Sequence, residues 1–248
     1  MQNIISFKKV VKNYGKNIAL DKLTFDLKEG NCTGLIGNNA CGKTTTINII
    51  CNLIKYDNGE VQAFGKKVTP NYISYKSKLG IVLSKPYYVE VFTPVEYLKF
   101  VCKFQYVPKN EIYQRVTDLI ELFELKADKN KSIKNLSSGN QMKVTLGAAL
   151  IHNPELLLLD EPFINIDIAT TEKIMNILKG FKGKKTIFIT SHNLDLVIEL
   201  CDNFLIMDKG KIIQNICKTD YDNTTTLKNE VKKLLVKENK EINLSWLG

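Results

Sequence analysis

No segment of the 248-residue sequence is apolar over a length that would cross a lipid bilayer. The most apolar window, LGAALIHNPELLLL, is interrupted by HNPE at positions 152–155, whereas a membrane-spanning helix needs about 20 consecutive apolar residues. The N-terminal stretch MQNIISFKKVVKNYGK reaches lysines before any apolar run typical of a secretory signal peptide. With 44% hydrophobic and 25% charged residues, the composition predicts a soluble globular protein.

The cysteines and histidines do not form the patterns of a metal site or of a disulfide framework. Six cysteines occur singly, without a CxxC pair, and only two histidines accompany them. A zinc site requires closely spaced Cys or His ligands, and a small disulfide-rich domain requires paired cysteines. The missing patterns argue against both and favour a reducing cytoplasmic compartment.

Positive charge exceeds negative charge, but it is not gathered into one segment. The net charge of +9 is compatible with a nucleic acid or an anionic membrane surface as a partner. No basic run is longer than a few residues, and no strand carries the aromatic pattern that stacks bases. A lysine-rich solvated surface explains the composition as well, so charge alone does not identify the partner.

Apolar patterns divide the chain into strands and helices. The segments IISFKKVVKNY and LTFDLKEG alternate apolar and polar residues, as half-exposed antiparallel strands do. The runs CTGLIG, ELLLLDEP and KTIFITSH are continuously apolar, which is typical of parallel strands covered on both faces. Residues from about 86 to 155 carry apolar side chains at helical spacing. We predict an α/β protein with a mostly parallel core sheet, an N-terminal antiparallel β subdomain and an inserted helical subdomain.

The C-terminal segment, residues 218–248, mixes lysines and acids in near balance and follows a main domain of residues 1–217. Its apolar residues Leu227, Val231, Leu234 and Leu235 have helical spacing. We predict a helical tail packed on the domain, with Trp246 helping to anchor it.

The segment GNNACGKTT, residues 37–45, follows a buried strand and precedes a helix. Gly37 and Gly42 allow the backbone to turn so that successive N–H groups point at phosphate oxygens. Lys43 supplies a charge for the β- and γ-phosphates, the Thr44 hydroxyl can bind Mg²⁺, and the helix N-terminus favours the same anion. A plain strand-to-helix turn is the alternative, but the buried strand and amphipathic helix favour a phosphate-binding loop.

Two further segments place polar residues at the ends of buried elements. ELLLLDEP would put Asp160 and Glu161 at the C-terminal end of a parallel strand, where α/β sheets bind ligands. Asp160 could hold Mg²⁺ through its water shell and Glu161 could act as a general base, although an acidic turn is the ordinary alternative. LSSGNQ, residues 136–141, would begin a helix with a serine N-cap and Gly139, which suits phosphate binding or a capped helix alone.

Considered alone, His192 in KTIFITSH and Tyr14 before a glycine are most simply structural residues. Taken together and in order, however, the motifs resemble the ATP-binding cassette of ABC transporters over about residues 3–217. Tyr14 falls at the adenine-stacking position, GNNACGKTT at the Walker A loop, LSSGN at the signature, LLLLDEP at Walker B, NID at the D-loop and TSH at the switch histidine. The resemblance implies a P-loop NTPase, RecA-like in its core, with ATP and Mg²⁺ as cofactors.

The resemblance also assigns residue roles. The positions that would bind nucleotide are Tyr14, Gly37, Asn38, Asn39, Ala40, Cys41, Gly42, Lys43, Thr44, Thr45, Ser137, Ser138, Gly139 and Asp167. The catalytic positions are Glu161, His192 and Lys43, and the positions toward Mg²⁺ are Thr44, Asp160 and Ser84. Each ATP would lie between the Walker A loop of one cassette and the signature of a second, identical or different cassette.

A membrane permease on a separate polypeptide is the implied partner, driven from the cytoplasmic face of the membrane by ATP-dependent closing and opening of the dimer. The short tail favours an exporter of drug, peptide or lipid-like substrates. A soluble cassette acting on ribosomes or DNA is one alternative, although such proteins usually carry two cassettes or a long coiled coil. A nucleotide-binding regulator with weak turnover is another. We expect no nucleic-acid partner.

The sequence departs from the family pattern at several positions. Ser84, in VLSKPYY, stands where the family has the Q-loop glutamine, and serine is too short to reach Mg²⁺ directly. Ser138 replaces the second glycine of the signature, Asn140 replaces its glutamine, and the D-loop lacks the common Ser-Gly pair. The coupling between nucleotide and permease is therefore the least conventional feature of the chain.

Ala40 and Cys41 stand where the family usually has Gly-Ala. We expect a negative φ at Ala40, because an L-residue is comfortable only there. For Cys41, near a phosphate and a helix N-terminus, we expect a lowered pKa and alkylation from which ATP protects.

Overall fold

The computed structural model describes residues 2–85 and 87–235. Its N-terminal part contains a four-stranded antiparallel sheet in the order β2-β1-β4-β5. The strands are β1 (Asn3–Tyr14), β2 (Asn17–Lys28), β4 (Asn58–Ala63) and β5 (Lys66–Lys67). In β2 the side chains of Leu23, Phe25 and Leu27 are buried and alternate with exposed polar ones, so one face of the sheet is covered.

The core is a six-stranded sheet in the order β10-β9-β3-β8-β7-β6. Its strands are β3 (Cys32–Gly37), β6 (Leu79–Val82), β7 (Leu156–Asp160), β8 (Thr186–Ser191), β9 (Asn203–Asp208) and β10 (Lys211–Cys217). The five strands from β9 to β6 are parallel and β10 is antiparallel at the edge. Because β3, β7 and β8 run parallel, their C-terminal ends lie at one edge of the sheet, and the segments that follow them meet there.

The central strands are buried on both faces, which explains their continuous apolar sequence. In β7, Leu157 and Leu159 pack into one hydrophobic cluster, and Leu156 and Leu158 pack into a second cluster on the other face. Successive side chains of a strand point to opposite faces, so a sheet covered twice needs apolar residues at every position. All five residues of β7 are buried accordingly.

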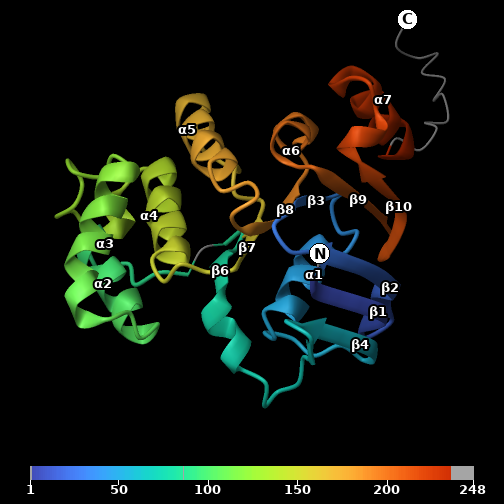
Figure 1. Ribbon diagram of the computed structural model, residues 1–248, viewed down its shortest axis with the longest axis horizontal. Helices are drawn as coiled ribbons and strands as arrows, with labels where there is room; N and C mark the ends of the chain where they lie inside the picture. Colours follow the sequence, from blue (N-terminus) through green and yellow to red (C-terminus); the bar gives the residue numbers. More distant parts are fainter. Residues whose placement is uncertain (1, 86, 236–248) are drawn as a thin grey trace, which may run out of the picture.

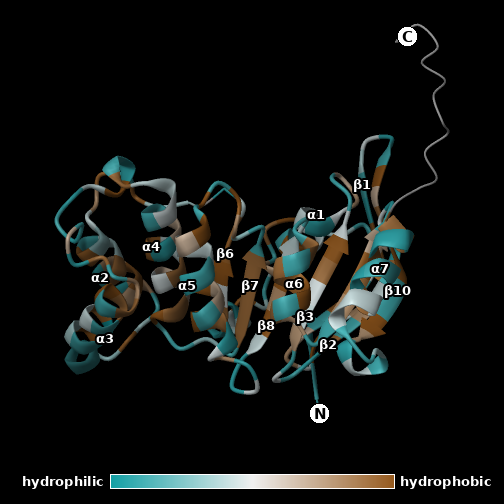
Figure 2. Cartoon of the chain, turned by 90° about the horizontal axis from the view of Figure 1, so that it is seen from above, coloured by the Kyte–Doolittle hydropathy of each residue, from teal (hydrophilic) through white to brown (hydrophobic). Residues whose placement is uncertain are grey.

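Seven α-helices lie among the described residues. They are α1 (Lys43–Ile50), α2 (Pro94–Phe104), α3 (Lys109–Leu122), α4 (Ser138–Leu150), α5 (Ile168–Lys179), α6 (Leu194–Leu200) and α7 (Thr224–Leu235). Short 3-10 helices cover Ser74–Lys78, Ile133–Asn135 and Lys218–Asp220. Helix α1 packs with the antiparallel sheet into one cluster, whereas α5 and α6 pack into the cluster on the opposite face of the core sheet (Figures 1 and 2).

Helices α2, α3 and α4 are inserted between β6 and β7 and lie at one end of the molecule (Figure 1). Helix α2 begins with a capping box in which Thr93 and Glu96 bind each other's backbone N–H groups. This arrangement and the two sheets confirm the predicted fold class. The predicted domain limits, 1–217 and 218–248 with helices in about 86–155, remain predictions.

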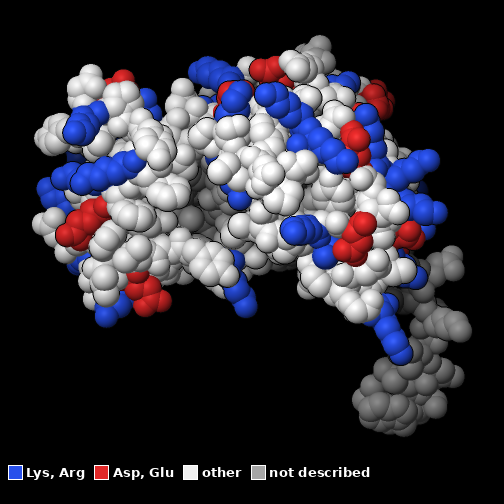
Figure 3. Space-filling view, turned by 90° about the horizontal axis from the view of Figure 1, so that it is seen from below, with Lys and Arg blue, Asp and Glu red and all other residues white. Residues whose placement is uncertain are grey.

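Helix α7 packs against the domain through Leu227 and Val231, which are fully buried, and through the half-buried Leu234 and Leu235. Trp246, which was expected to anchor the tail, lies outside the described residues. No helix within residues 2–85 and 87–235 is long and apolar enough to cross a lipid bilayer. On the face drawn in Figure 3, Lys and Arg side chains are scattered and interrupted by acidic and uncharged atoms.

Candidate functional site

The predicted phosphate loop connects β3 to α1. Gly37 approaches other backbone closely, since a Cβ atom at this position would lie 2.4 Å from the Met207 carbonyl oxygen. Gly42 has a φ of 116°, in the left-handed region that favours glycine, and forms the N-cap of α1. Both glycines are therefore required by the backbone of this loop, Gly37 for lack of space and Gly42 for its φ, as the motif spacing predicts.

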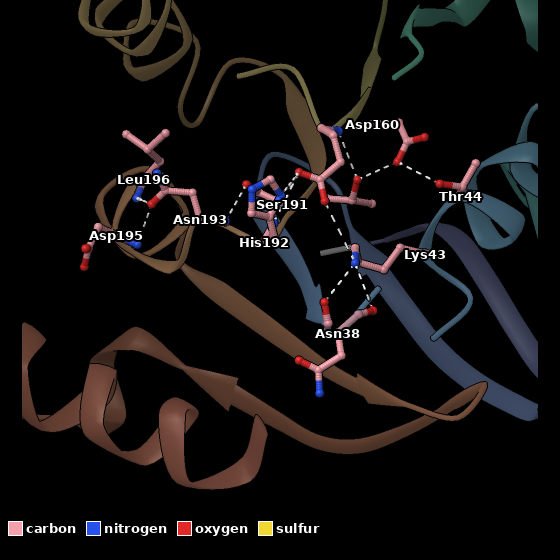
Figure 4. A network of polar contacts seen from close by, with 12 residues as sticks. Asn38, Lys43, Thr44, Asp160, Ser191, His192, Asn193, Asp195 and Leu196 are labelled. Carbon is pink, nitrogen blue, oxygen red and sulfur yellow. Dashed lines mark hydrogen bonds and ion pairs between the residues drawn. The ribbon is translucent and has the colours of Figure 1, made fainter. Parts of the chain in front are cut away.

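Lys43 is buried and its ammonium group points back into the loop (Figure 4). Its Nζ atom donates to the carbonyl oxygens of Gly37 at 2.8 Å and of Asn38 at 3.3 Å. The same Nζ lies 3.9 Å from Oε1 of Glu161. A buried ammonium held beside the loop backbone provides the positive charge that a phosphate chain requires.

The expectation of a negative φ at Ala40 is wrong, because this residue has a φ of 60°. The loop reverses direction between Asn38 and the start of α1, and it does so through a left-handed residue at position 40 before the left-handed Gly42. A left-handed L-residue costs about 1–2 kcal/mol relative to the right-handed region. Ala40 therefore holds strain that glycine would not.

The expectation of a lowered pKa at Cys41 is also wrong. Burial raises the pKa of the Cys41 thiol, and this effect outweighs the lowering by the Lys43 charge. The side chain is 5% exposed and packs in the hydrophobic cluster beneath the loop. Its sulfur lies against Gly37, where a Cβ atom would come within 2.5 Å of it. The thiol thus faces the core and is not directed at the phosphate position.

Asp160, the last residue of β7, is fully buried. Oδ1 accepts a hydrogen bond from the Thr190 hydroxyl at 2.6 Å and one from the Thr44 hydroxyl at 3.4 Å. Oδ2 is buried and has no hydrogen-bond partner among the described residues. A carboxylate with one oxygen beside the Thr44 hydroxyl and a second oxygen left free fits Mg²⁺, which prefers oxygen ligands and keeps waters and substrate phosphates as its others.

Glu161 stands between Lys43 and His192. Its Oε2 atom accepts a hydrogen bond from the His192 backbone N–H at 3.2 Å and lies 2.9 Å from the His192 Nδ1 atom. The Glu161 side chain is 11% exposed, whereas the His192 side chain is 59% exposed. Glu161 also has a φ of 51°, a strained value that clusters at functional sites. A carboxylate, an ammonium and an imidazole from three separate segments are thereby brought to one point.

A cavity of about 670 Å³ opens over these groups. It is lined by Tyr14, Asn17, Ile18, Ala19, Asn39, Ala40, Gly42, Lys43, Thr44, Thr45, Ser84, Glu161, Ile164 and His192. Most of the predicted nucleotide-facing residues of the Walker motifs are therefore assembled around one space. Tyr14 is half exposed, with its ring available at the cavity. The other predicted Walker residues, Gly37, Asn38, Cys41 and Asp160, do not line the space.

The sequence reasoning missed Asn17, Ile18, Ala19 and Ile164 as lining residues. The first three belong to β2, which is joined to β1 by a tight hairpin in which Tyr14 pairs with Asn17. Ile18 is 60% exposed, an unusual position for a large apolar side chain beside an aromatic ring. The turn signal at Gly15-Lys16 could have placed these residues opposite Tyr14.

The signature residues Ser137, Ser138 and Gly139 do not line this cavity. Ser137 caps α4 by accepting a hydrogen bond from the Asn140 N–H at 3.3 Å. The Ser138 hydroxyl donates to the Asn165 carbonyl oxygen at 2.5 Å. Ser137 and Ser138 are exposed, and both are therefore available to a ligand outside the cavity of their own chain.

Asp167 lies beside this signature and not beside the Walker A loop. It caps α5, and the hydrogen bond from the Thr170 N–H, 2.8 Å long, lowers the pKa of its carboxyl group. Its Oδ2 atom would lie 3.4 Å from a Cβ atom added to Gly139. Signature and D-loop thus form a second exposed polar region of the same chain.

Asn38 makes a contact that the sequence did not predict. Its side-chain amide donates to the carbonyl oxygen of Leu235, the last residue of α7, at 3.2 Å. Lys228 of the same helix forms an ion pair with Asp195, three positions after His192. Helix α7 therefore touches both the phosphate loop and the segment that follows the switch histidine.

Comparison with known proteins agrees with this geometry. The chain matches the ABC transporter family model over residues 20–164. It is 33% identical over 212 residues to the linearmycin resistance ATP-binding protein LnrL of Bacillus subtilis, which covers 85% of this chain and 68% of that protein. The spermidine/putrescine import ATP-binding protein PotA of Clostridium novyi is 32% identical over 216 residues, with 86% and 62% covered.

A solved structure of similar shape is the dimeric post-hydrolysis state of the ATP-binding cassette MJ0796 bound to ADP and Pi. It superposes with a TM-score of 0.79 and 25% identity, covering 86% of this chain and 98% of that chain. A further relative is the SkfA peptide export ATP-binding protein SkfE of Bacillus subtilis, 28% identical over 225 residues, with 90% and 93% covered. The chain belongs to the ABC transporter family and is an ATP-binding cassette ATPase of that family.

Proposed function

We propose that the cavity above the phosphate loop is the ATP hydrolysis site of a transporter subunit that drives a separate membrane permease. The observation that carries the proposal is the meeting of Glu161, Lys43 and His192 at that cavity, next to the unpartnered oxygen of Asp160. These are the groups that phosphoryl transfer to water requires: a base, a phosphate-binding cation and a metal ligand.

Each residue at the cavity has a separate role in the proposed hydrolysis of ATP. Lys43 and the N-terminal N–H groups of α1 bind the β- and γ-phosphates, and Tyr14 stacks on the adenine at the rim. The Glu161 carboxylate accepts a proton from the attacking water, and His192 holds that carboxylate while facing the γ-phosphate. Thr44 and Asp160 would hold Mg²⁺, which neutralises negative charge on the phosphates.

The general-base assignment is tested with Glu161→Gln. We expect turnover to fall about 100-fold or more, because general acid–base catalysis contributes that factor, while ATP binding persists. Glu155→Gln is the matched control, since Glu155 precedes the same strand and forms a surface ion pair with Lys78. Turnover of Glu161→Gln within twofold of that control would refute the assignment.

We propose that the signature serves the nucleotide of a second cassette. Ser137 and Gly139 lie outside the cavity of their own chain, and the relative MJ0796 has been solved as a dimer. Lys43→Ala and Ser137→Arg chains should each be inactive alone, and mixing them should restore turnover at the one intact composite site. No restoration on mixing would contradict a site shared between two chains.

We propose that the permease docks in an apolar groove beside β6. The groove has a volume of about 410 Å³ and is lined mainly by residues of β6, the segment after it, α2 and α4. Within it Tyr87 and Phe104 are 81% and 72% exposed, unusual values for aromatic side chains. Leu83 lines the groove while its neighbour Ser84 lines the nucleotide cavity, so these two adjacent residues border both spaces.

Phe104→Asp tests the groove. We expect the variant to lose co-purification with the permease while keeping its own ATPase activity, because a charge cannot enter an apolar contact without a partner. Tyr113→Asp is the matched control, since Tyr113 is 75% exposed on α3 and does not line the groove. Equal permease recovery with both variants would exclude this docking site.

Export is the direction we propose, because relatives are named for linearmycin resistance and for peptide export. Another relative is named for spermidine/putrescine import, so the direction requires its own measurement. Reconstitution with the permease in inside-out vesicles decides it: ATP-dependent accumulation of substrate inside the vesicles supports export, and ATP-dependent loss supports import.

The short side chain at Ser84 favours a second candidate function, which we propose as the alternative: a nucleotide-binding regulator with weak turnover. Ser84 lines the cavity at the position of the family's glutamine but carries a shorter side chain. Under this candidate, Ser84→Gln should raise turnover in the presence of the permease. Unchanged turnover would count against any role for this position.

A further inference from the structure

A buried threonine on β8 connects the two acidic residues of the site. Thr190 is fully buried, and in the parallel pairing of β7 with β8 it lies opposite Asp160. Its hydroxyl donates to Oδ1 of Asp160 at 2.6 Å. The backbone N–H of Glu161 donates to the same hydroxyl at 3.1 Å and to the Thr190 carbonyl oxygen at 3.1 Å. One side chain thus contacts both residues of the acidic pair.

These contacts use the only proton of the hydroxyl and one of its two acceptor positions. A hydroxyl has a single proton to donate, and here it goes to Oδ1 of Asp160. Oδ1 also lies 3.4 Å from the Thr44 hydroxyl, the other group proposed to hold Mg²⁺, whereas Oδ2 is buried and has no partner among the described residues. The hydroxyl of Thr190 therefore fixes how the Asp160 carboxylate is turned beside Thr44.

The same hydroxyl also stabilises the backbone of Glu161. That residue has a φ of 51°, which is unfavourable for a glutamate and needs compensating contacts. Its N–H is held by two oxygens of Thr190, and its carboxylate then reaches the backbone N–H of His192. A valine at position 190 would match the apolar character of β8 and would supply only the carbonyl contact.

We propose that Thr190 is a positioning residue that orients the Asp160 carboxylate toward the metal and the Glu161 carboxylate toward the attacking water. The inference rests on the proposed hydrolysis site. The ordinary alternative is a buried threonine whose hydroxyl only satisfies nearby backbone. Thr186 provides that comparison within the same strand, because it is also buried and its hydroxyl accepts a hydrogen bond from the Gly30 N–H at 3.0 Å.

The test compares Thr190→Val with Thr186→Val, two substitutions of the same shape in one strand. Residues that hydrogen-bond a metal ligand typically change metal affinity or activity by about 10-fold to 100-fold when removed. We expect Thr190→Val to weaken Mn²⁺ binding in the presence of ADP by about 10-fold or more. Thr190→Ser keeps the hydroxyl and should stay within about threefold of the wild type, as should Thr186→Val.

Mn²⁺ binding is followed by electron paramagnetic resonance, with a protein-free titration of Mn²⁺ and ADP subtracted, so that no turnover is involved. Equal Mn²⁺ affinity of Thr190→Val and Thr186→Val would overturn the inference, and so would a loss in Thr190→Ser as large as in Thr190→Val. If Thr190→Val does not fold, Thr190→Ala against Thr190→Ser decides in the same way.

The variant Asp160→Asn distinguishes a failure of the proposed hydrolysis site from a failure of the role proposed for Thr190. If Asp160→Asn leaves Mn²⁺ binding intact, Asp160 is not the metal ligand, and both the site and the role of Thr190 are overturned. If Asp160→Asn abolishes binding while Thr190→Val does not weaken it, only the role of Thr190 is overturned. Weakened binding in both, with rescue by Thr190→Ser, supports the inference.

Discussion

Replacing Ala40 with glycine should stabilise the nucleotide-free protein. Ala40 has a φ of 60°, and a left-handed L-residue costs about 1–2 kcal/mol, which glycine avoids. Against this, glycine gives the unfolded chain more freedom, which costs about 0.4–1 kcal/mol of stability. Ala40 is exposed, so removing its methyl group uncovers no core surface. The free energy of unfolding should therefore rise by about 0.8 kcal/mol, because strain relief exceeds the entropy loss.

Thermal unfolding in the absence of nucleotide measures this change. In a protein of this size, 1 kcal/mol shifts the melting temperature by about 2–4 °C, so Ala40→Gly should melt about 2–3 °C higher. Ala127 is the matched control: it is exposed, lies in a turn and does not have a positive φ. Ala127→Gly should melt about 2 °C lower, because only the entropy loss remains. If both variants melt lower by the same amount, Ala40 is not strained.

Three other predictions follow from buried groups. The Cys41 thiol should react with iodoacetamide much more slowly than the Cys217 thiol, because Cys41 is buried and burial raises its pKa. ATP should leave the labelling of Cys41 unchanged, and rapid labelling that ATP suppresses, seen by mass spectrometry, would contradict this. Burial lowers the pKa of His152 below the ordinary value of about 6.5. Between these two pKa values the unfolded chain binds a proton that the folded protein does not, so the free energy of unfolding should fall as the pH drops below about 6.5 toward the folded-state pKa. Melting curves of His152→Gln from pH 7.5 to 5 should lack that part of the pH dependence. If the variant and the wild type show the same pH dependence, His152 is not its source. Leu227→Ala should lower the free energy of unfolding by about 2–5 kcal/mol in urea titrations, because Leu227 is fully buried between α7 and the core; a loss below 1 kcal/mol would show that α7 is loosely attached.

The fold was predictable because its signals are local and repeated. Continuous apolar runs mark β3, β7 and β8, and each is followed by a polar motif. Parallel strands place their C-terminal ends at one edge, so Lys43, Glu161 and His192 could be expected to meet although up to 149 residues separate them. The order of the motifs along the chain was sufficient to expect these three side chains at one point, which is where the structure places them.

The details that were wrong depend on tertiary packing around single residues. Whether Cys41 faces the phosphate or the core is decided by the space beside Gly37 and Met207, which no local pattern encodes. The φ of Ala40 is set by the path between β3 and α1. Thr190 is the first residue of the TSH motif, but the motif pointed only to His192. The contact of Thr190 with Asp160 depends on the pairing of β7 with β8, which the local sequence does not show.

The loop between Glu161 and Asp167 links the two polar regions of the chain. It begins at Glu161, which contacts His192 at the cavity, and ends at Asp167 beside Gly139, which is proposed to face the nucleotide of a second cassette. Within it the Ile164 N–H donates to the Glu161 carbonyl oxygen at 3.3 Å, and the Ser138 hydroxyl binds the Asn165 carbonyl oxygen. Ser138 therefore has a specific use where the family has glycine: it joins the signature helix to the loop that carries the base. In the proposed two-cassette site, Glu161 is connected to the signature through Asn165, four residues further on, and the hydrogen bond of Asn165 with Ser138. We therefore expect a shift of Glu161 after hydrolysis to move the signature that would hold the second ATP.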